Sequence, residues 1–172
     1  MIVCTENTNI YGYKVLGNVD WLMDKNYYCV IAIGDCNIKK QIYDKLKLTD
    51  NKFATLIHPN VMHSKYVDLG EGCIICAGSI LTVNIQIGNH VIINIDTTVG
   101  HDVIIRDFST ILPSVNISGN VTIEEQVNVG TGTAIIQGIN ICDNVTVGAG
   151  SVVIKDITET GTYVGVPAKR IK

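Results

Sequence analysis

Residues 87–105 read IGNHVIINIDTTVGHDVII, with an aliphatic residue at every sixth position from Ile87 to Ile105. The same spacing runs from Leu69 to Val153 without an insertion, over fifteen consecutive positions that hold only Leu, Ile or Val. An α-helix repeats every 3.6 residues and a coiled coil every seven, so neither accounts for a period of six. We therefore expect short strands joined by tight turns and wound into a solenoid. The fifteen residues, all expected to be buried, are Leu69, Ile75, Leu81, Ile87, Ile93, Val99, Ile105, Ile111, Ile117, Ile123, Val129, Ile135, Ile141, Val147 and Val153.

A second series without charged members stands two residues before each of these positions, from Val67 to Ser151. Residues two apart point to the same face of a strand, so both series should face inward. Glycine often follows the aliphatic residue, as at Gly70 and Gly130, and we expect it to supply the conformational freedom of the turns. Three units close a triangular coil of 18 residues, so 67–156 should form about five coils.

The first sixty residues follow a different pattern. Residues 27–34 read as a buried strand that ends at Gly34, residues 37–46 have the spacing of an amphipathic helix, and residues 53–57 read as a second strand. We expect two domains, a small α/β domain over 1–60 and a β-solenoid with a C-terminal tail over 61–172.

Composition restricts the possible partners. The 172 residues include 47% apolar and 17% charged residues, which favours a chain that is ordered throughout. A net charge of −3 supplies no basic surface for nucleic acid, and no apolar run of about 18 residues predicts a membrane span. No charged and apolar leader precedes Met1, so we expect a cytoplasmic protein.

The six-residue units resemble those of the hexapeptide-repeat acyltransferases, and the ending from Val164 to Arg170 resembles their exit from the last coil. This resemblance implies a left-handed parallel β-helix, acetyl-CoA as co-substrate and a homotrimer. The segments 13–17, 31–34 and 56–59 resemble the sugar-nucleotide-binding domain of one subfamily, the nucleotide-amino-sugar N-acetyltransferases and sialic acid O-acetyltransferases. The first strand, glycine-rich turn and helix of that domain are missing here, so we expect a truncated domain in which Gly34 approaches the nucleotide-linked sugar.

His101 is the candidate general base. Histidine takes up a proton readily near neutral pH, and His101 stands in a predicted turn, two residues after Val99, so it should point outward. The stretch 94–102 resembles the catalytic segment of the family. That resemblance implies that His101 is the base, that Asp102 is its partner, and that Asn94 contacts the substrate.

The same resemblance implies acetyl-CoA contacts in the second half of the chain. Thr110 lies where relatives place a residue that contacts acetyl-CoA, and Thr131 and Ala149 lie on the stretch that lines its pantetheine arm. Lys169 and Arg170 are candidates for the phosphates of CoA.

The leading hypothesis is an acetyl-CoA-dependent N-acetyltransferase that acts on a nucleotide-linked deoxyamino sugar in glycan precursor biosynthesis, without a metal. O-acetylation of a sugar or sialic acid is the nearest alternative. His58 and His63 are five residues apart, which leaves a zinc-dependent carbonic anhydrase of the γ type as a further alternative. A β-helix without catalytic activity, serving as an assembly module, is the last alternative.

Overall fold

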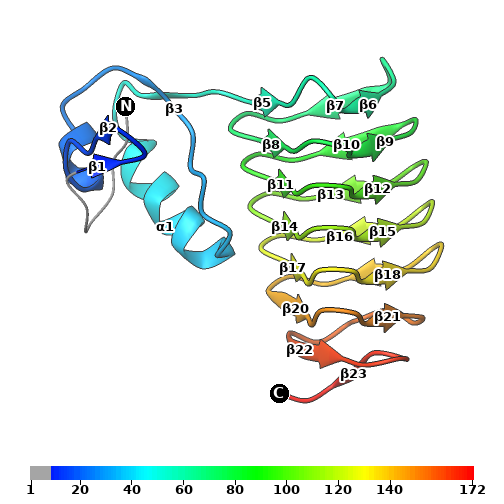
Figure 1. The fold of residues 1–172 in the computed structure, drawn as a ribbon. Coiled ribbons are helices and arrows are strands. Elements are labelled where there is room, and N and C mark those ends of the chain that lie inside the picture. Colours follow the sequence, from blue (N-terminus) through cyan, green and yellow to red (C-terminus); the bar gives the residue numbers. More distant parts are fainter. Residues whose placement is uncertain (1–8) are drawn as a thin grey trace.

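The computed structural model describes residues 9–172, in which a small α/β part precedes a parallel β-solenoid (Figure 1). The α/β part contains β1 (Asn9–Ile10), β2 (Tyr13–Lys14), the 3-10 helix η1 (Val19–Leu22), β3 (Tyr28–Cys29), α1 (Cys36–Leu46) and β4 (Lys52–Phe53). In the described residues no helix combines the length and apolar character that a bilayer span requires.

Three sheets form the sides of the solenoid. The eight-stranded sheet contains β5 (Leu56–Ile57), β8 (Ile74–Ile75), β11 (Ile92–Ile93), β14 (Thr110–Ile111), β17 (Asn128–Val129), β20 (Val145–Val147), β22 (Gly161–Val164) and β23 (Lys169–Arg170). The six-stranded sheet contains β6 (Met62–His63), β9 (Ile80–Leu81), β12 (Thr98–Val99), β15 (Asn116–Ile117), β18 (Ala134–Ile135) and β21 (Val152–Val153). The five-stranded sheet contains β7 (Val67–Leu69), β10 (Ile85–Ile87), β13 (Ile104–Ile105), β16 (Thr122–Ile123) and β19 (Asn140–Ile141).

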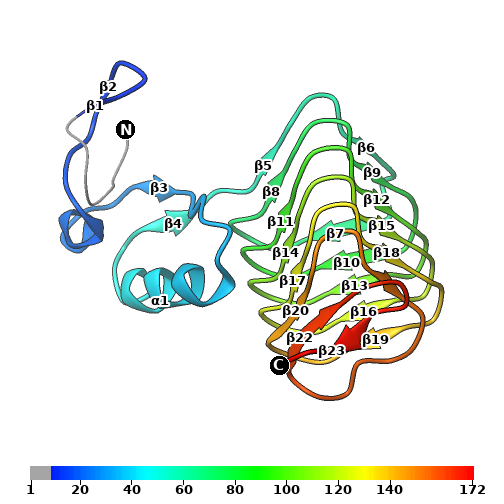
Figure 2. The ribbon, with the colours of Figure 1, turned by 60° about the horizontal axis from the view of Figure 1, so that its bottom comes forward.

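The winding is left-handed. Figure 2 turns the C-terminal end toward the viewer, and each coil runs clockwise from the eight-stranded to the six-stranded and then to the five-stranded sheet as the chain advances toward that end. Strands 18 residues apart pair in parallel register, for example Ile92 with Thr110. The predicted parallel β-helix is therefore confirmed.

The solenoid has six coils, one more than expected. The additional coil is the first one, in which β5 pairs with β8 and β6 pairs with β9. The six-residue series misses it because His63 stands where the next aliphatic residue would be. The inward positions of an end coil lack a neighbour on one side, and His63 is exposed there.

Both predicted inward series form the core. Of the fifteen aliphatic residues only Leu69, in the first coil, is half-buried, and the other fourteen are buried. The polar members of the second series bond to the backbone. Ser79 Oγ donates to Asn94 O at 3.0 Å and Ser109 Oγ to Glu124 O at 2.8 Å, while Ser151 Oγ accepts from Gly165 N at 3.1 Å. The buried hydroxyls are thus satisfied within the solenoid.

The explanation expected for the glycines is wrong. Where a turn between strands of the solenoid has a residue with positive φ, that residue stands three positions after the aliphatic residue, as at Asn84 and Asp102. Gly70 and Gly130 stand one position after it, and a Cβ on Gly130 would lie 2.4 Å from Ala149 N of the next coil. These glycines are required because stacked coils approach each other closely there, and not because of their φ angles.

Columns of turns form the three corners of the solenoid, and each corner takes its name from one feature. The Asn94 corner comprises the turns 76–78, 94–96, 112–114, 130–132 and 148–150. The His101 corner comprises 82–84, 100–102, 118–120, 136–138 and 154–156, and the α1 corner comprises 70–72, 88–90, 106–108, 124–126 and 142–144. The six-stranded sheet separates the Asn94 corner from the His101 corner, and the five-stranded sheet separates the His101 corner from the α1 corner.

Helix α1 matches the expected helix and lies beside the strands of the eight-stranded sheet in both views (Figures 1 and 2). Asp35 caps it by accepting a hydrogen bond from Ile38 N. The expected strand over 27–34 pairs only at β3, and Tyr28 is 75% exposed because β3 has β4 as its single partner among the described residues. The expected strand over 53–57 divides between β4, which pairs with β3, and β5, which belongs to the solenoid.

Candidate active site

His101 lies in the turn between β12 and β13, with its side chain half exposed. Its ring packs over Gly119 in the following coil, where a Cβ would lie 2.5 Å from His101 Nε2. A side chain at position 119 would therefore displace the imidazole from its place. The glycine provides the space in which His101 stands.

Asp102 orients the imidazole of His101. Its Oδ2 lies 2.7 Å from His101 Nδ1, and its φ of +59 turns the backbone so that these neighbouring side chains meet. With Nδ1–H donating to this carboxylate, Nε2 carries the lone pair and is open to a substrate proton. The structure thus brings the two predicted catalytic residues together.

Asn84 was missed by the sequence analysis. Its Nδ2 donates to Asp102 Oδ1, so the second oxygen of the carboxylate is held by the preceding coil. This hydrogen bond and the one to His101 lower the pKa of Asp102, which keeps the group ionised. The spacing of 18 residues between Asn84 and Asp102 is one full coil, and that arithmetic is the signal that identifies Asn84.

Three of the residues predicted to contact the substrate or acetyl-CoA lie in a column across the six-stranded sheet from His101. Asn94, Thr131 and Ala149 all lie at the Asn94 corner, in the third, fifth and sixth coils. Thr131 and Ala149 are exposed, and Thr131 O accepts a hydrogen bond from Gly150 N at 2.8 Å. One side of the triangle, roughly 13 Å for four extended residues, separates this column from His101 of the same chain.

Thr110 is a correction. It is 1% exposed, because α1 covers it, and its Oγ1 accepts a hydrogen bond from Lys39 Nζ at 3.0 Å. Lys39 is itself fully buried and also donates to Ser109 O at 3.3 Å, and burial lowers its pKa to about 8. Thr110 therefore has no open surface for acetyl-CoA. The sequence did not predict this, because the repeat does not indicate that a helix from the N-terminal part covers the position.

The remaining candidate binding residues, Lys169, Arg170 and Gly34, lie in other elements than His101. Lys169 and Arg170 are exposed in β23, where Arg170 Nη1 lies 2.7 Å from Glu159 Oε2. Gly34 is exposed in the loop before α1, and a Cβ there would meet no atom within 4 Å. A ligand can approach the backbone at Gly34, while Arg170 already has a carboxylate partner.

His58 and His63, on which the zinc alternative rests, each contact a residue nearby in the chain. His58 Nδ1 accepts a hydrogen bond from Asn60 N at 3.0 Å, and His63 Nδ1 lies 3.3 Å from Ser64 O. Over residues 9–172, no three His, Cys, Asp or Glu side chains are placed to hold one metal ion.

Two family models match the chain on either side of residue 60. The PglD N-terminal domain matches residues 4–46, and the hexapeptide repeat of succinyl-transferase matches residues 67–83 and 120–155. A UDP-N-acetylbacillosamine N-acetyltransferase of Bacillus subtilis (strain 168) is 42% identical over 48 residues, which are 28% of this chain and 22% of that protein. The match therefore spans about a fifth of the curated relative's length.

Solved structures match over nearly the whole chain. The acetyltransferase domain of PglB from Neisseria gonorrhoeae FA1090 has a TM-score of 0.94 at 29% identity, covering 98% of this chain and 85% of that one. A second structure of that domain, in complex with acetyl coenzyme A, has a TM-score of 0.91 at 29% identity, covering 97% and 83%.

A perosamine N-acetyltransferase from Caulobacter crescentus, with one histidine replaced by asparagine and in complex with CoA and GDP-perosamine, has a TM-score of 0.89 at 28% identity. The match covers 95% of this chain and 80% of that one. A solenoid and an N-terminal part like those of this chain thus occur together in solved acetyltransferase structures. The chain therefore resembles the hexapeptide-repeat acetyltransferases that carry a PglD-type N-terminal domain, in both matched sequence regions and in the fold.

Proposed function

We propose that this protein transfers an acetyl group from acetyl-CoA to the amino group of a nucleotide-linked deoxyamino sugar. The observation that supports this most strongly is the chain of contacts from Asn84 through Asp102 to His101, which leaves His101 Nε2 open at the surface. The named relatives that bind GDP-perosamine or act on UDP-N-acetylbacillosamine support the substrate class and favour an amine over a hydroxyl as the acceptor.

The reaction assigned to this site is an acyl transfer. The neutral amine attacks the thioester carbonyl, a C–N bond forms and the C–S bond breaks. His101 Nε2 takes a proton from the attacking nitrogen and returns it to the departing sulfur, so that CoA leaves as the thiol. Asp102 stabilises the imidazolium that exists between the two transfers.

We propose that the enzyme is a homotrimer, and the positions of the two corners support a site shared between copies. His101 and the column of Asn94, Thr131 and Ala149 stand on opposite sides of the six-stranded sheet. Large aliphatic side chains gather on this sheet and its two corners, with exposed fractions between 39% and 46%. They are Ile80, Val83, Ile95, Ile136 and Ile154. A ring in which the His101 corner of one copy faces the Asn94 corner of the next covers these side chains and assembles the site.

The direct test is a panel of UDP-, GDP- and dTDP-linked amino sugars incubated with acetyl-CoA and analysed by mass spectrometry. We expect one member of the panel to gain a single acetyl group on nitrogen, with release of one thiol per acetyl group. Acetylation on oxygen would favour the O-acetyltransferase alternative, and no acetylation of any member would contradict the proposal.

A further inference from the structure

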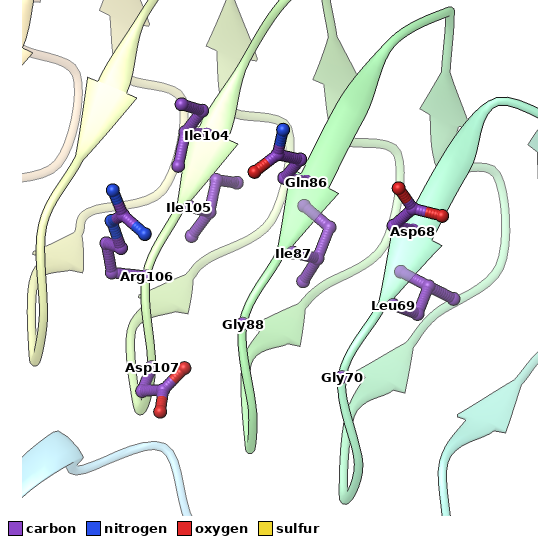
Figure 3. Close-up of a pocket in the computed structure, with 10 residues that line it drawn as sticks. All are labelled: Asp68, Leu69, Gly70, Gln86, Ile87, Gly88, Ile104, Ile105, Arg106 and Asp107. Carbon is purple, nitrogen blue, oxygen red and sulfur yellow. The ribbon is translucent and has the colours of Figure 1, made fainter.

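A pocket of about 310 Å³ lies on the five-stranded sheet between the His101 corner and the α1 corner (Figure 3). Asp68, Gln86 and Ile104 project from β7, β10 and β13 and lie one above another in the first three coils. Gly70 and Gly88, without side chains, leave the space beside them open. Gly70 and Gly88 thus leave a hollow at one position of the first two coils, and a long side chain at the same position of the third coil closes its end.

That long side chain is Arg106, which stands where the two preceding coils have Gly70 and Gly88. Among the described residues that line the pocket, Arg106 is the cation. Its nearest carboxylate is Glu124, with 3.6 Å between Arg106 Nε and Glu124 Oε2, and both side chains are about half exposed. An exposed pair at this distance contributes little stability, so the guanidinium is available to another anion.

The neighbouring carboxylate is not available in the same way. Asp107 Oδ1 accepts a hydrogen bond from Asn89 N at 2.8 Å, and its Oδ2 accepts one from Asn89 Nδ2 at 3.2 Å. Asp107 thus joins two coils at the α1 corner and does not pair with Arg106, so Glu124 is the carboxylate that a ligand phosphate would have to displace.

Strand β13 connects the pocket to the candidate base. Ile104 follows His101 by three residues, and Arg106 follows Ile104 by two residues on the same outward side of the strand. The pocket lies in the first three coils, whereas Thr131 and Ala149 lie in the fifth and sixth. His101, in the third coil, separates an N-terminal half of the solenoid from the half in which acetyl-CoA contacts are proposed.

We propose that this pocket binds the sugar ring and the first phosphate of the acceptor, with Arg106 as the residue that recognises the phosphate. This inference rests on the proposed function and extends it by a binding site. The amine lies at His101 Nε2, the ring lies over Ile104 and Gln86, and the phosphate on the anomeric carbon lies at Arg106. Ile104 contacts the deoxygenated carbon, the Gln86 amide bonds to a hydroxyl, and Asp68 repels a phosphate from the opposite end.

The test compares two acceptors on four proteins. One acceptor is the nucleotide-linked amino sugar that the wild-type enzyme acetylates, and the other is the 1-O-methyl glycoside of the same amino sugar, which has the amine but no phosphate. The proteins are wild type, Arg106→Gln and Arg106→Lys, with Lys45→Gln as a matched loss of one exposed positive charge.

We expect Arg106→Gln to raise the KM for the nucleotide-linked sugar about 10- to 100-fold, because a charge-assisted hydrogen bond to phosphate is lost. Arg106→Lys should recover part of this loss, since it keeps the charge without the planar fork. The KM for acetyl-CoA and the kcat/KM for the methyl glycoside should stay within about twofold of wild type, as should every value for Lys45→Gln. If the glycoside reacts too slowly to measure, inhibition by the matching nucleoside diphosphate is measured instead. Its inhibition constant should rise in Arg106→Gln by the same factor as the KM for the nucleotide-linked sugar.

Two results would overturn the inference, and they differ in what else they affect. If wild type acetylates the nucleotide-linked sugar while Arg106→Gln leaves its KM unchanged, or harms both acceptors equally, Arg106 does not bind the phosphate and the proposed function stands. If wild type acetylates no nucleotide-linked amino sugar, the proposed function and this site both fail.

Discussion

At the scale of single residues, the orientation and tautomer of His101 depend on two side chains from two coils. Asp102 accepts from His101 Nδ1 and is itself held by Asn84, so the proton-accepting atom of the imidazole is Nε2. This arrangement makes the base ready before substrate binds, because the tautomer and ring orientation are already set.

Asp102→Asn tests that role. The amide keeps the shape but loses the negative charge beside the imidazolium that forms during the reaction, so kcat should fall while the KM for acetyl-CoA changes little. Asp143→Asn is the matched control, because the amide oxygen can still accept the hydrogen bond from Glu125 N. An unchanged kcat in Asp102→Asn, measured on the same amine substrate as wild type, would exclude the proposed electrostatic role.

At the scale of elements, α1 is fixed to the solenoid by a buried group of aromatic rings around His90. The ring of His90 stacks on Phe108 at 5.3 Å between centroids, and Tyr43 of α1 and Phe53 of β4 lie at 4.7 and 4.6 Å. Neither ring nitrogen of His90 has a hydrogen-bond partner, and its side chain is fully buried. Burial, and then the nearby Lys39, lower the pKa of His90 to about 4, while Asp107 acts in the opposite direction.

The stability of the protein should therefore depend on pH through His90. As pH falls from 6.5 toward 4, the unfolded chain binds a proton at this residue while the folded protein does not, so folding is destabilised across that window. Between pH 7 and pH 5 the loss from this group should be roughly 2 kcal/mol. Denaturant unfolding of wild type and His90→Leu at fixed protein concentration measures it. The free energy of unfolding of wild type minus that of His90→Leu should be lower at pH 5 than at pH 7 by that amount. An equal value at both pH values would contradict the account.

Sequence alone predicted those features of the elements that depend on contacts between adjacent units of the repeat. The fifteen aliphatic positions, the helix before the solenoid and the outward turn at His101 all follow from spacing. The coverage of Thr110 by α1 depends on how two different kinds of structure pack, and no periodicity in the chain encodes it. The first coil was missed for a related reason, since an end coil does not need an aliphatic residue at His63.

At the scale of the whole molecule, the proposed trimer would make the active site a property of the assembly, because the two corners are separate in one chain. Each site in the proposed trimer takes His101 from one copy and the Asn94 corner from the next. Two inactive variants should then restore activity when they share a trimer, because one copy supplies what the other lacks.

Mixing His101→Ala with Ala149→Arg, after dissociation and reassembly, measures this directly. In a random one-to-one mixture about a quarter of the sites should combine an intact histidine with an intact Asn94 corner, and the activity should approach a quarter of that of wild type. Light scattering on the same sample should give the mass of three chains. Mixed trimers without activity would show that each site is contained in one chain.

The central claim is that His101 is the base for acetyl transfer, and the kcat of His101→Ala tests it most directly. Because a positioned general base is worth roughly 10²–10⁴-fold in rate, kcat should fall by that factor. The KM for acetyl-CoA should change little, since the imidazole removes a proton and is not the main contact with the co-substrate. His63→Ala, which removes an exposed histidine from the first coil, should keep the rate of wild type. If His101→Ala retains more than about half of the wild-type kcat, a barrier change below about 0.5 kcal/mol, then His101 does not act as the base.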